Sequence, residues 1–288
     1  MRRLDCKPIR DNVMNELREK TQLLINKGLR VPSLAVVLVG SDPASQTYVR
    51  NKANACKELG YMHFQYNLSE DCKEEELLDL IESLNRDDCI DGILVQVPLP
   101  KQIDELKAIA AIAPEKDVDG FTEGNAGRLM IGKDCFLPCT PKGIMRIIDF
   151  YGIETRGRRA VVIGRSNIVG KPVSMLLMSK GRDATVTVCN SYTEDLRKHT
   201  LDADIVIVAV GKPGFIDSSY IKDGAAVIDV GINRIEDSSK RSGFRVVGDV
   251  DYDSFGNRDV SLTPVPGGVG VMTVAMLMEN TYQARMER

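Results

Sequence analysis

The chain has 288 residues, of which 43% are hydrophobic and 27% charged, and its formal net charge is −3. This composition is typical of a globular protein of about two domains, and it argues against bulk electrostatic binding to nucleic acid or to a membrane surface. The seven cysteines are odd in number and form no CxxC pair, and the chain has only two histidines. We therefore expect no disulfide framework, no metal site and a reducing, cytoplasmic location. No apolar run is long enough to span a bilayer.

Short β-branched runs separated by longer helical patterns predict an α/β fold. The runs cover residues 34–40, 91–100, 159–164, 184–190, 203–211 and 225–231. This alternation is typical of βαβ units, in which parallel sheets are covered by helices on both faces.

The stretch 116–141 is rich in Gly and Pro and lacks clear periodicity, so it is the best domain boundary. After it we expect a helix opened by Thr140, with Pro141 at its first position. A final helix is predicted from about Gly268, and because no strand follows it, it does not connect two strands of the second sheet. The predicted organisation is therefore two lobes, 1–137 completed by 268–288, and a Rossmann-like cofactor domain of 140–266.

A helix predicted over 45–60 places a lysine on its apolar face. At 100° per residue, Lys52 lies about 40° from Tyr48, in the middle of the apolar arc. A lysine there must snorkel to water, pair with a carboxylate or face a cavity. In a cavity, desolvation would lower its pKa and suit it to proton transfer.

Three other residues of the first half each have two interpretations. Gln96 lies near the carboxyl end of an apolar strand, where ligands bind in open α/β sheets, but a structural hydrogen bond to a loop fits it equally well. Asp119 precedes a glycine, and taken alone it fits a turn or cap slightly better than a binding site. Tyr48, taken alone, is more often a core residue than a catalytic one.

The second half contains an irregular dinucleotide-binding pattern. A strand is followed by a tight turn at Gly164 and a helix beginning near Gly170, which points backbone N–H groups at a pyrophosphate. Arg165 would lie beside the phosphates. Because Ser166 stands where the second glycine of the usual spacing would be, a plain strand–helix corner remains an alternative.

The strand 184–190 bears on the choice of cofactor. It ends in Asn190 and Ser191, without the acidic residue that would hold the ribose hydroxyl of NAD. The absence of that carboxylate leaves room for a 2′-phosphate, so the pattern favours NADP.

Five motifs resemble, in order and spacing, those of the bifunctional methylenetetrahydrofolate dehydrogenase/cyclohydrolases. They are TYVRNKANACKELG, DGILVQVPLP, PEKDVDGFT, GRSNIVGKPVSMLL and PVPGGVGVMTVAML, and they extend over nearly the whole chain. Two positions depart from the family pattern. Val271 stands where a proline is usual, and Ser191 lies in CNSYT, where many members have a basic neighbour.

The resemblance implies the residues of the site. As catalytic residues of a folate pocket it implies Tyr48, Lys52, Gln96 and Asp119. As substrate-binding residues it implies Val97, Pro98 and Gly267. For NADP it implies Gly164, Arg165, Ser166, Ser191 and Ile232. It further implies a pocket in the cleft between the two lobes, tetrahydrofolate one-carbon derivatives as partners, and a homodimer formed through the cofactor domains.

The implied reactions make different demands on one pocket. Oxidation of methylenetetrahydrofolate needs mainly alignment with the nicotinamide, because two nitrogens stabilise the resulting cation. Hydrolysis of methenyltetrahydrofolate to 10-formyltetrahydrofolate needs a proton shuttle, and the candidate is Lys52, hydrogen-bonded to Gln96 and oriented by Tyr48. Asp119 would accept hydrogen bonds from the pterin edge.

Two other hypotheses are open. A different two-domain NADP oxidoreductase, of the shikimate dehydrogenase type, would show no folate-dependent absorbance change. A sensor without turnover would keep the cofactor turn, although the presence of Lys52, Gln96 and Asp119 disfavours it.

Overall fold

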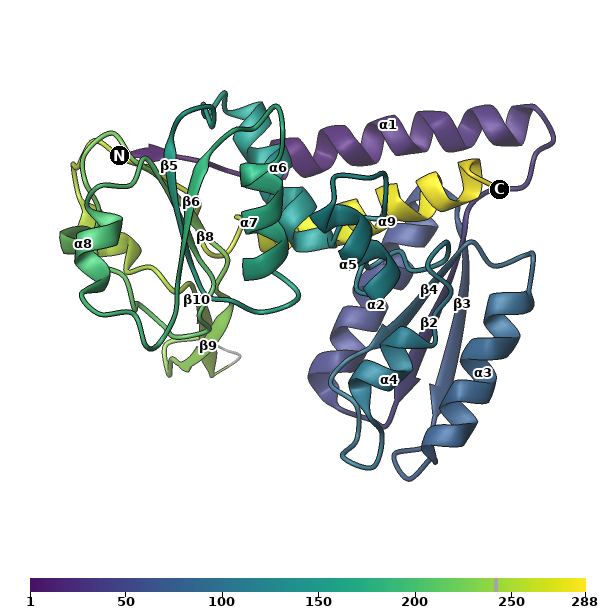
Figure 1. Ribbon diagram of the computed structural model, residues 1–288. Helices are drawn as coiled ribbons and strands as arrows, with labels where there is room; N and C mark the ends of the chain where they lie inside the picture. The colour runs from purple at the N-terminus through teal and green to yellow at the C-terminus, as the bar shows by residue number, and fades with distance from the viewer. Residues whose placement is uncertain (241–242) are drawn as a thin grey trace. The chain divides into compact units, whose positions relative to one another are not determined.

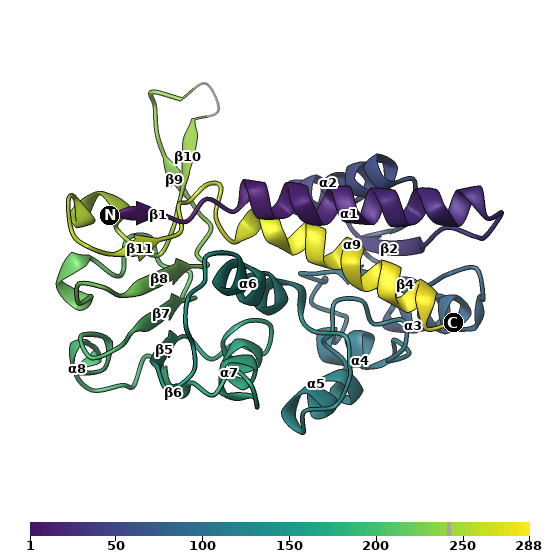
Figure 2. The ribbon, with the colours of Figure 1, turned by 90° about the horizontal axis from the view of Figure 1, so that it is seen from above.

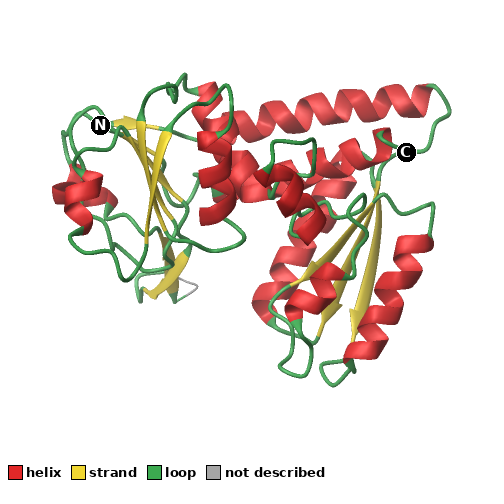
Figure 3. Cartoon of the chain, viewed as in Figure 1, coloured by secondary structure: helices red, strands yellow, loops and turns green. Residues whose placement is uncertain are grey.

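The computed structural model describes residues 1–240 and 243–288 and divides into two units, which are considered separately. One consists of residues 11–139 and 274–288, and the other of residues 1–10 and 140–273. The α/β fold class predicted from the sequence is confirmed (Figure 3). No helix in the described part of the chain is long and apolar enough to cross a membrane.

The unit of residues 11–139 and 274–288 has a three-stranded parallel sheet at its centre (Figure 1). Its strand order is β3 (Met62–Leu68), β2 (Ser33–Val39), β4 (Gly92–Gln96). All seven residues of β2 are buried, as its uninterrupted apolar sequence requires of a central strand covered on both faces. Helices α3 (Glu74–Arg86) and α4 (Glu105–Ala110) cover one face, and Figure 2 shows α2 (Pro43–Leu59) on the other.

Helix α2 carries the lysine singled out in the sequence. It begins two residues before the predicted start because Asp42 caps it, accepting a hydrogen bond from the Ser45 N–H at 2.7 Å. It ends at Leu59, where Gly60 takes the left-handed conformation (φ 75°).

Three more helices lie wholly or largely in this unit. They are α1 (Lys7–Asn26), α5 (Glu123–Met130) and α9 (Gly270–Met286). The α5 helix was not predicted, since it is short, contains two glycines and has no clear apolar repeat; Thr122 caps it by accepting from the Asn125 N–H. In α9, the Met278 carbonyl accepts a hydrogen bond from the Tyr61 hydroxyl at 3.3 Å, which ties the end of the chain to this unit.

The unit of residues 1–10 and 140–273 contains a six-stranded parallel sheet. Its strands, in spatial order, are β1 (Arg2–Arg3), β11 (Ser261–Leu262), β8 (Ala226–Asp229), β7 (Ile205–Val208), β5 (Arg159–Ile163) and β6 (Thr185–Cys189). The predicted division placed residues 1–10 in the other lobe. They lie here because β1 forms a parallel pair with β11.

The chain order of this sheet creates a switch point. The chain passes from β5 to β6 on one side and then returns across β5 to β7. At such a reversal the turns that follow the two central strands diverge and leave room for a ligand at their carboxyl ends.

Helices and short segments complete the unit. They are α6 (Cys139–Phe150), α7 (Gly170–Met178), α8 (Leu196–Thr200), η1 (Ser218–Tyr220) and η2 (Tyr252–Phe255). The connecting helix α6 begins one residue before the predicted Thr140. Strands β9 (Asn233–Glu236) and β10 (Phe244–Val247) form an antiparallel pair that projects from the six-stranded sheet (Figure 2).

Candidate functional site

Lys52 and Gln96 form a direct hydrogen bond. The Lys52 Nζ donates to Gln96 Oε1 at 2.6 Å, which joins α2 to the carboxyl end of β4. The Gln96 Nε2 donates to the Val97 carbonyl oxygen at 2.7 Å. Because each end of the amide has its own partner, the Gln96 oxygen is turned toward the lysine. The structure therefore contains both contacts considered for Gln96: its nitrogen bonds to the loop at Val97, and its oxygen bonds to Lys52.

The environment of Lys52 disfavours its charge. Burial lowers the pKa of Lys52, and the nearby Asp119 carboxylate and Cys139 thiol partly oppose that effect. Burial likewise raises the pKa of Asp119, while Lys52 acts in the opposite direction. The two groups therefore lie close enough to influence each other in a partly desolvated region, which is a combination typical of functional sites.

The two aspartates of the DVDG sequence have different surroundings. Asp117 is buried and accepts hydrogen bonds from the N–H groups of Gly120 (2.9 Å), Phe121 (3.2 Å) and Thr122 (2.7 Å). The turn-forming role considered for Asp119 is thus filled by Asp117. Asp119 itself accepts a long hydrogen bond from the Cys139 Sγ at 3.5 Å.

Tyr48 lies one turn before Lys52 in α2, and 48% of it is exposed, although the helical projection placed it on the apolar arc. Its hydroxyl makes no hydrogen bond within residues 1–240 and 243–288, so an orienting contact with Lys52 is not seen. Val97 and Pro98 follow Gln96 directly, joined by a cis peptide bond; Val97 is partly buried and Pro98 is exposed.

Two residues beside Asp119 were not identified from the sequence. Cys139, which is buried, stood out in the sequence only as one of seven cysteines, and Asn280 lies in the last helix between Glu279 and Thr281. The Asn280 Nδ2 donates to the Val118 carbonyl oxygen at 2.8 Å, next to Asp119 in the chain. An asparagine on the buried side of a helix was the one available signal, since a buried amide requires partners.

The turn after β5 requires glycine in this structure. Gly164 has φ +119°, and a Cβ at this position would collide with the Ala209 carbonyl oxygen at the end of β7. A Cβ on Gly170, the first residue of α7, would in turn collide with the Gly164 carbonyl oxygen. The strand end, the turn and the helix N-terminus therefore pack backbone against backbone at the switch point of the sheet, which fits a pyrophosphate.

Arg165 and Ser166 are both exposed in this turn. The Ser166 Oγ accepts from the N–H groups of Val169 (3.2 Å) and Gly170 (3.4 Å), so the serine shapes the entry to α7. Arg165 makes no hydrogen bond or ion pair in the described part of the chain, which leaves its guanidinium available to an anion. Ser191 is also exposed, two residues after the end of β6.

Ile232 and Gly267 lie in one hollow of about 160 Å³, formed by the segments after β8 and β11. The Ile232 side chain is 52% exposed, and its Cδ1 lies close to Gly270 at the start of α9. The structure therefore brings together these two residues, one predicted for the cofactor and the other for the substrate.

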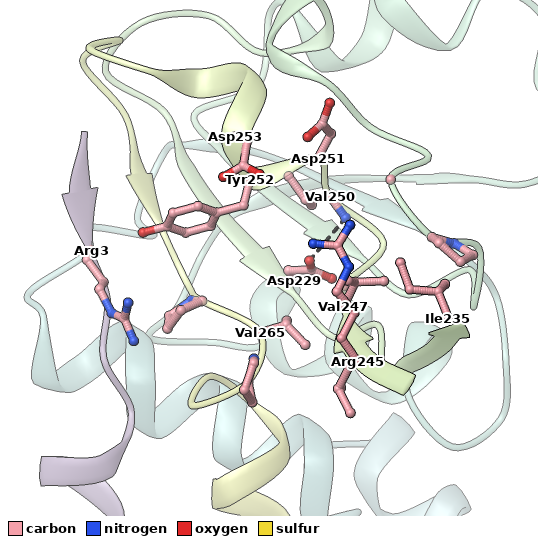
Figure 4. A pocket seen from close by; sticks show the side chains of 16 residues that line it. Arg3, Asp229, Ile235, Arg245, Val247, Val250, Asp251, Tyr252, Asp253 and Val265 are labelled. Atoms are coloured by element: carbon pink, nitrogen blue, oxygen red, sulfur yellow. Dashed lines mark hydrogen bonds between the residues drawn. The ribbon is translucent and has the colours of Figure 1, made fainter. Parts of the chain in front are cut away.

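A second cavity, of about 550 Å³, adjoins this hollow and shares Asp229 and Pro266 with its lining (Figure 4). Its lining includes Arg3, Arg245, Tyr252 and Asp229, and none of the predicted site residues. Asp229 is buried, and its carboxylate accepts from the N–H groups of Gly231, Asp249 and Val250 at 2.9–3.0 Å. Burial raises the pKa of Asp229 to about 6, an effect that these hydrogen bonds oppose and Asp249 reinforces.

Two family models match the chain. The model described as tetrahydrofolate dehydrogenase/cyclohydrolase, catalytic domain, matches residues 4–119. The model described as tetrahydrofolate dehydrogenase/cyclohydrolase, NAD(P)-binding domain, matches residues 138–288.

Curated relatives extend over the same length. The chain is 52% identical over 285 residues to the bifunctional protein FolD of Chlorobium luteolum, with 98% of this chain and 97% of that protein covered. It is also 52% identical over 288 residues to bifunctional protein FolD of Campylobacter hominis, with 100% and 98% covered.

Solved structures agree with these matches. The FolD methylenetetrahydrofolate dehydrogenase/cyclohydrolase of Campylobacter jejuni is 46% identical, with a TM-score of 0.93 and coverage of 99% of this chain and 98% of that chain. The FolD of Trypanosoma brucei, solved with NADP and an inhibitor, is 39% identical, with a TM-score of 0.92 and coverage of 99% and 97%. The shikimate 5-dehydrogenase of Thermus thermophilus, at 13% identity and a TM-score of 0.51, shares the fold alone.

Proposed function

The chain belongs to the tetrahydrofolate dehydrogenase/cyclohydrolase family, and on this premise we propose that it is a bifunctional one-carbon folate enzyme. It oxidises methylenetetrahydrofolate to methenyltetrahydrofolate with NADP and hydrolyses the product to 10-formyltetrahydrofolate. The observation that carries this proposal is the Lys52–Gln96 hydrogen bond beside Asp119, since it provides a desolvated amine where the hydrolysis step needs a proton shuttle.

The unit of residues 1–10 and 140–273 would hold NADP. When bound, NADP supplies the acceptor for the hydride. The Gly164 turn and the N-terminus of α7 would receive the pyrophosphate, with the free Arg165 guanidinium beside it. Ser191 would bind the 2′-phosphate at the end of β6, which has no carboxylate to repel it.

For the dehydrogenase step the protein must align the one-carbon unit with the nicotinamide and exclude water. Little acid or base is needed, because the one-carbon unit lies between two nitrogens that stabilise the cation. Asp119 would fix the pterin by accepting hydrogen bonds from its amino and amide edge. Tyr48, half exposed on α2, and the Val97–Pro98 segment would form contacts along the same substrate. Gly267 is proposed as a further substrate-binding residue.

The cyclohydrolase step asks for proton transfer as well. Water attacks the methenyl carbon, and a ring nitrogen must be protonated before the formyl product forms. Lys52 is suited to carry that proton because burial keeps its pKa below the ordinary lysine value, while the Gln96 oxygen holds the amine in place.

The two units of the chain would have different roles, and the protein would act as a dimer. We place the folate-binding role in the unit of residues 11–139 and 274–288, and the cofactor role in the unit of residues 1–10 and 140–273. The protein forms a two-fold homodimer through its cofactor domains and works in the cytoplasm, where its cysteines stay reduced. A monomeric mass by light scattering at micromolar concentration would contradict the dimer.

An assay of the purified protein with methylenetetrahydrofolate and NADP or NAD tests the function. Reduced cofactor and methenyl absorbance should both rise, NADP should be preferred, and added methenyltetrahydrofolate should be hydrolysed faster than in buffer. No folate-dependent signal with either cofactor would overturn the proposal.

A further inference from the structure

Asn280 links the last helix to the two chain segments that carry Asp119 and Cys139. The side chain is fully buried, at 0% exposure, within the unit of residues 11–139 and 274–288. Its Nδ2 donates to the Val118 carbonyl oxygen at 2.8 Å and to the Leu137 carbonyl oxygen at 3.0 Å. The first carbonyl is one residue before Asp119, and the second is two residues before Cys139.

Cys139 closes this arrangement on the Asp119 carboxylate. Its Sγ lies 3.8 Å from the Asn280 Nδ2 and 3.5 Å from both Asp119 Oδ1 and the Val118 carbonyl oxygen, so its single S–H can donate to either of these two oxygens. The asparagine thus holds two carbonyls and a thiol, and the thiol in turn contacts the carboxylate.

The backbone next to Asp119 is restrained from the other direction as well. Gly120 has φ +72°, and a Cβ there would lie 2.6 Å from the Phe136 carbonyl oxygen and 2.8 Å from the Leu137 carbonyl carbon. The residues on both sides of Asp119 are therefore held against the 136–139 segment. A shift of that segment would carry the carboxylate with it.

We propose that Asn280 is a positioning residue for the folate reactions, because it fixes the Asp119 carboxylate relative to Lys52 through Val118 and Cys139. This inference rests on the proposed function of Asp119 as the acceptor for the pterin edge. The role of Asn280 is to hold the acceptor where the pterin and the lysine both require it, since displacements of about 1 Å can cost about a hundredfold in rate.

The test is Asn280→Leu, which has a similar shape but donates no hydrogen bond. The matched control is Thr281→Val on the same helix, which loses a buried hydrogen bond to the Leu277 carbonyl (2.8 Å) that is internal to α9. Both variants should lose stability. Only Asn280→Leu should raise the KM for methylenetetrahydrofolate and for methenyltetrahydrofolate, by about tenfold or more, while the KM for NADP stays within twofold.

A pH profile gives a second readout that a purely structural role would not move. The Asp119 carboxylate opposes the lowering of the Lys52 pKa, so a displaced carboxylate should leave that pKa lower still. The limb of the cyclohydrolase profile due to Lys52 should therefore move to lower pH in Asn280→Leu and stay in place in Thr281→Val.

The outcomes separate this inference from the proposed function. If the wild-type protein turns over neither folate, the proposed function fails. If the wild type is active and Asn280→Leu matches Thr281→Val in KM and pH profile, Asn280 only stabilises the helix and the inference is wrong. Should the leucine variant not fold, Asn280→Ser, which keeps one donor, is measured instead and should show the same changes to a smaller extent.

Discussion

Asp117 and Asp119 stand two residues apart and have opposite hydrogen-bonding roles. Asp117 is enclosed by three backbone N–H groups and the Asn125 amide, whereas Asp119 contacts only the weak Cys139 donor among the hydrogen bonds described for it. The first carboxylate shapes the loop, and the second takes no part in the backbone hydrogen bonds described for that loop.

Asp117→Asn should therefore lower stability, whereas Asp119→Asn should weaken the use of folate substrates. Asp117→Asn weakens several buried hydrogen bonds, and the free energy of unfolding should fall by about 2 kcal/mol or more. Asp119→Asn should change that free energy little and instead raise the KM of both activities for folate. Urea titrations and steady-state kinetics measure the two effects, and a folate KM that rises equally in both variants would contradict the division of roles.

Lys52→Met should separate the two activities. Methionine keeps the apolar stem of the side chain, so α2 should pack as before. Hydrolysis of methenyltetrahydrofolate should fall by about a hundred- to ten-thousand-fold, because the proton shuttle is lost. Hydride transfer should fall much less, and methenyltetrahydrofolate should accumulate.

The exposed Lys57 on the same helix provides the control, and Lys57→Met should leave both rates near wild type. Equal loss of both activities in a folded Lys52→Met that still binds folate would make Lys52 a residue that positions the shared substrate. No change in either would make it an ordinary snorkelling lysine.

Arg165→Ala should distinguish NADP from NAD. Its guanidinium has no partner among the described residues, so if it contacts the 2′-phosphate, its loss raises the KM for NADP more than the KM for NAD. Lys180→Ala, which removes an exposed cation just beyond the other end of α7, should change neither. Equal increases for the two cofactors would show that Arg165 touches only the shared pyrophosphate.

Gly164→Ala should abolish cofactor binding while testing the packing at the switch point. The added Cβ meets the Ala209 carbonyl in addition to the strain of a positive φ. Gly181 also has a positive φ (+93°) but open space around it, so Gly181→Ala should cost only the strain, about 1–2 kcal/mol. Thermal unfolding and NADP titration should both be affected more at position 164; similar effects at the two positions would argue against the tight turn.

Asp229 should make stability depend on pH in the direction opposite to most carboxylates. Its pKa is about 6 in the folded protein, whereas the ordinary value for an aspartate is 3.8. Between about pH 4 and 6 this carboxyl is therefore mostly ionised in the unfolded chain and mostly protonated in the folded protein. The contribution of this group to the free energy of unfolding should therefore fall by up to about 3 kcal/mol as the pH rises from 4 to 6, and stay constant above that.

Urea titrations across that range measure the effect as the difference between wild type and Asp229→Asn. The exposed Asp253 lines the same cavity, and Asp253→Asn should preserve the wild-type slope. If the free energy of unfolding depends on pH in the same way in Asp229→Asn as in the wild type, ionisation of Asp229 does not destabilise the folded protein.

The sequence predicted the parts of the fold that have a strong local pattern. Strands β2, β4, β5, β6, β7 and β8 lie within the six predicted runs, apart from Ser33 at the start of β2, and all of them except β6 are mostly buried. Helices α2 and α7 begin near their expected residues. Strand β3, MHFQYNL, was missed because polar and apolar residues mix along an edge strand that is mostly exposed or half-buried. Strands β1 and β11 have two residues each, and only their pairing across the chain defines them.

The same limit applies to the site. Lys52 stood out because a cation on an apolar helix face breaks a pattern, and Gln96 because it interrupts an apolar strand. Asp117 and Asp119 could not be told apart in sequence, since their roles depend on which N–H groups the folded loop turns inward. Cys139 and Asn280 acquire their importance from contacts between residues about 140 positions apart, which no local pattern contains.

The geometry of Gln96 has a consequence for how long Lys52 can stay in place during turnover. Its amide nitrogen is engaged by the Val97 carbonyl, so it presents only an oxygen to the lysine. A neutral amine still has two N–H bonds and can donate one to that oxygen, just as the ammonium does. The tether therefore persists in both protonation states, and the lone pair that the neutral amine gains is directed elsewhere. Lys52 can release a proton and take one back without leaving its position.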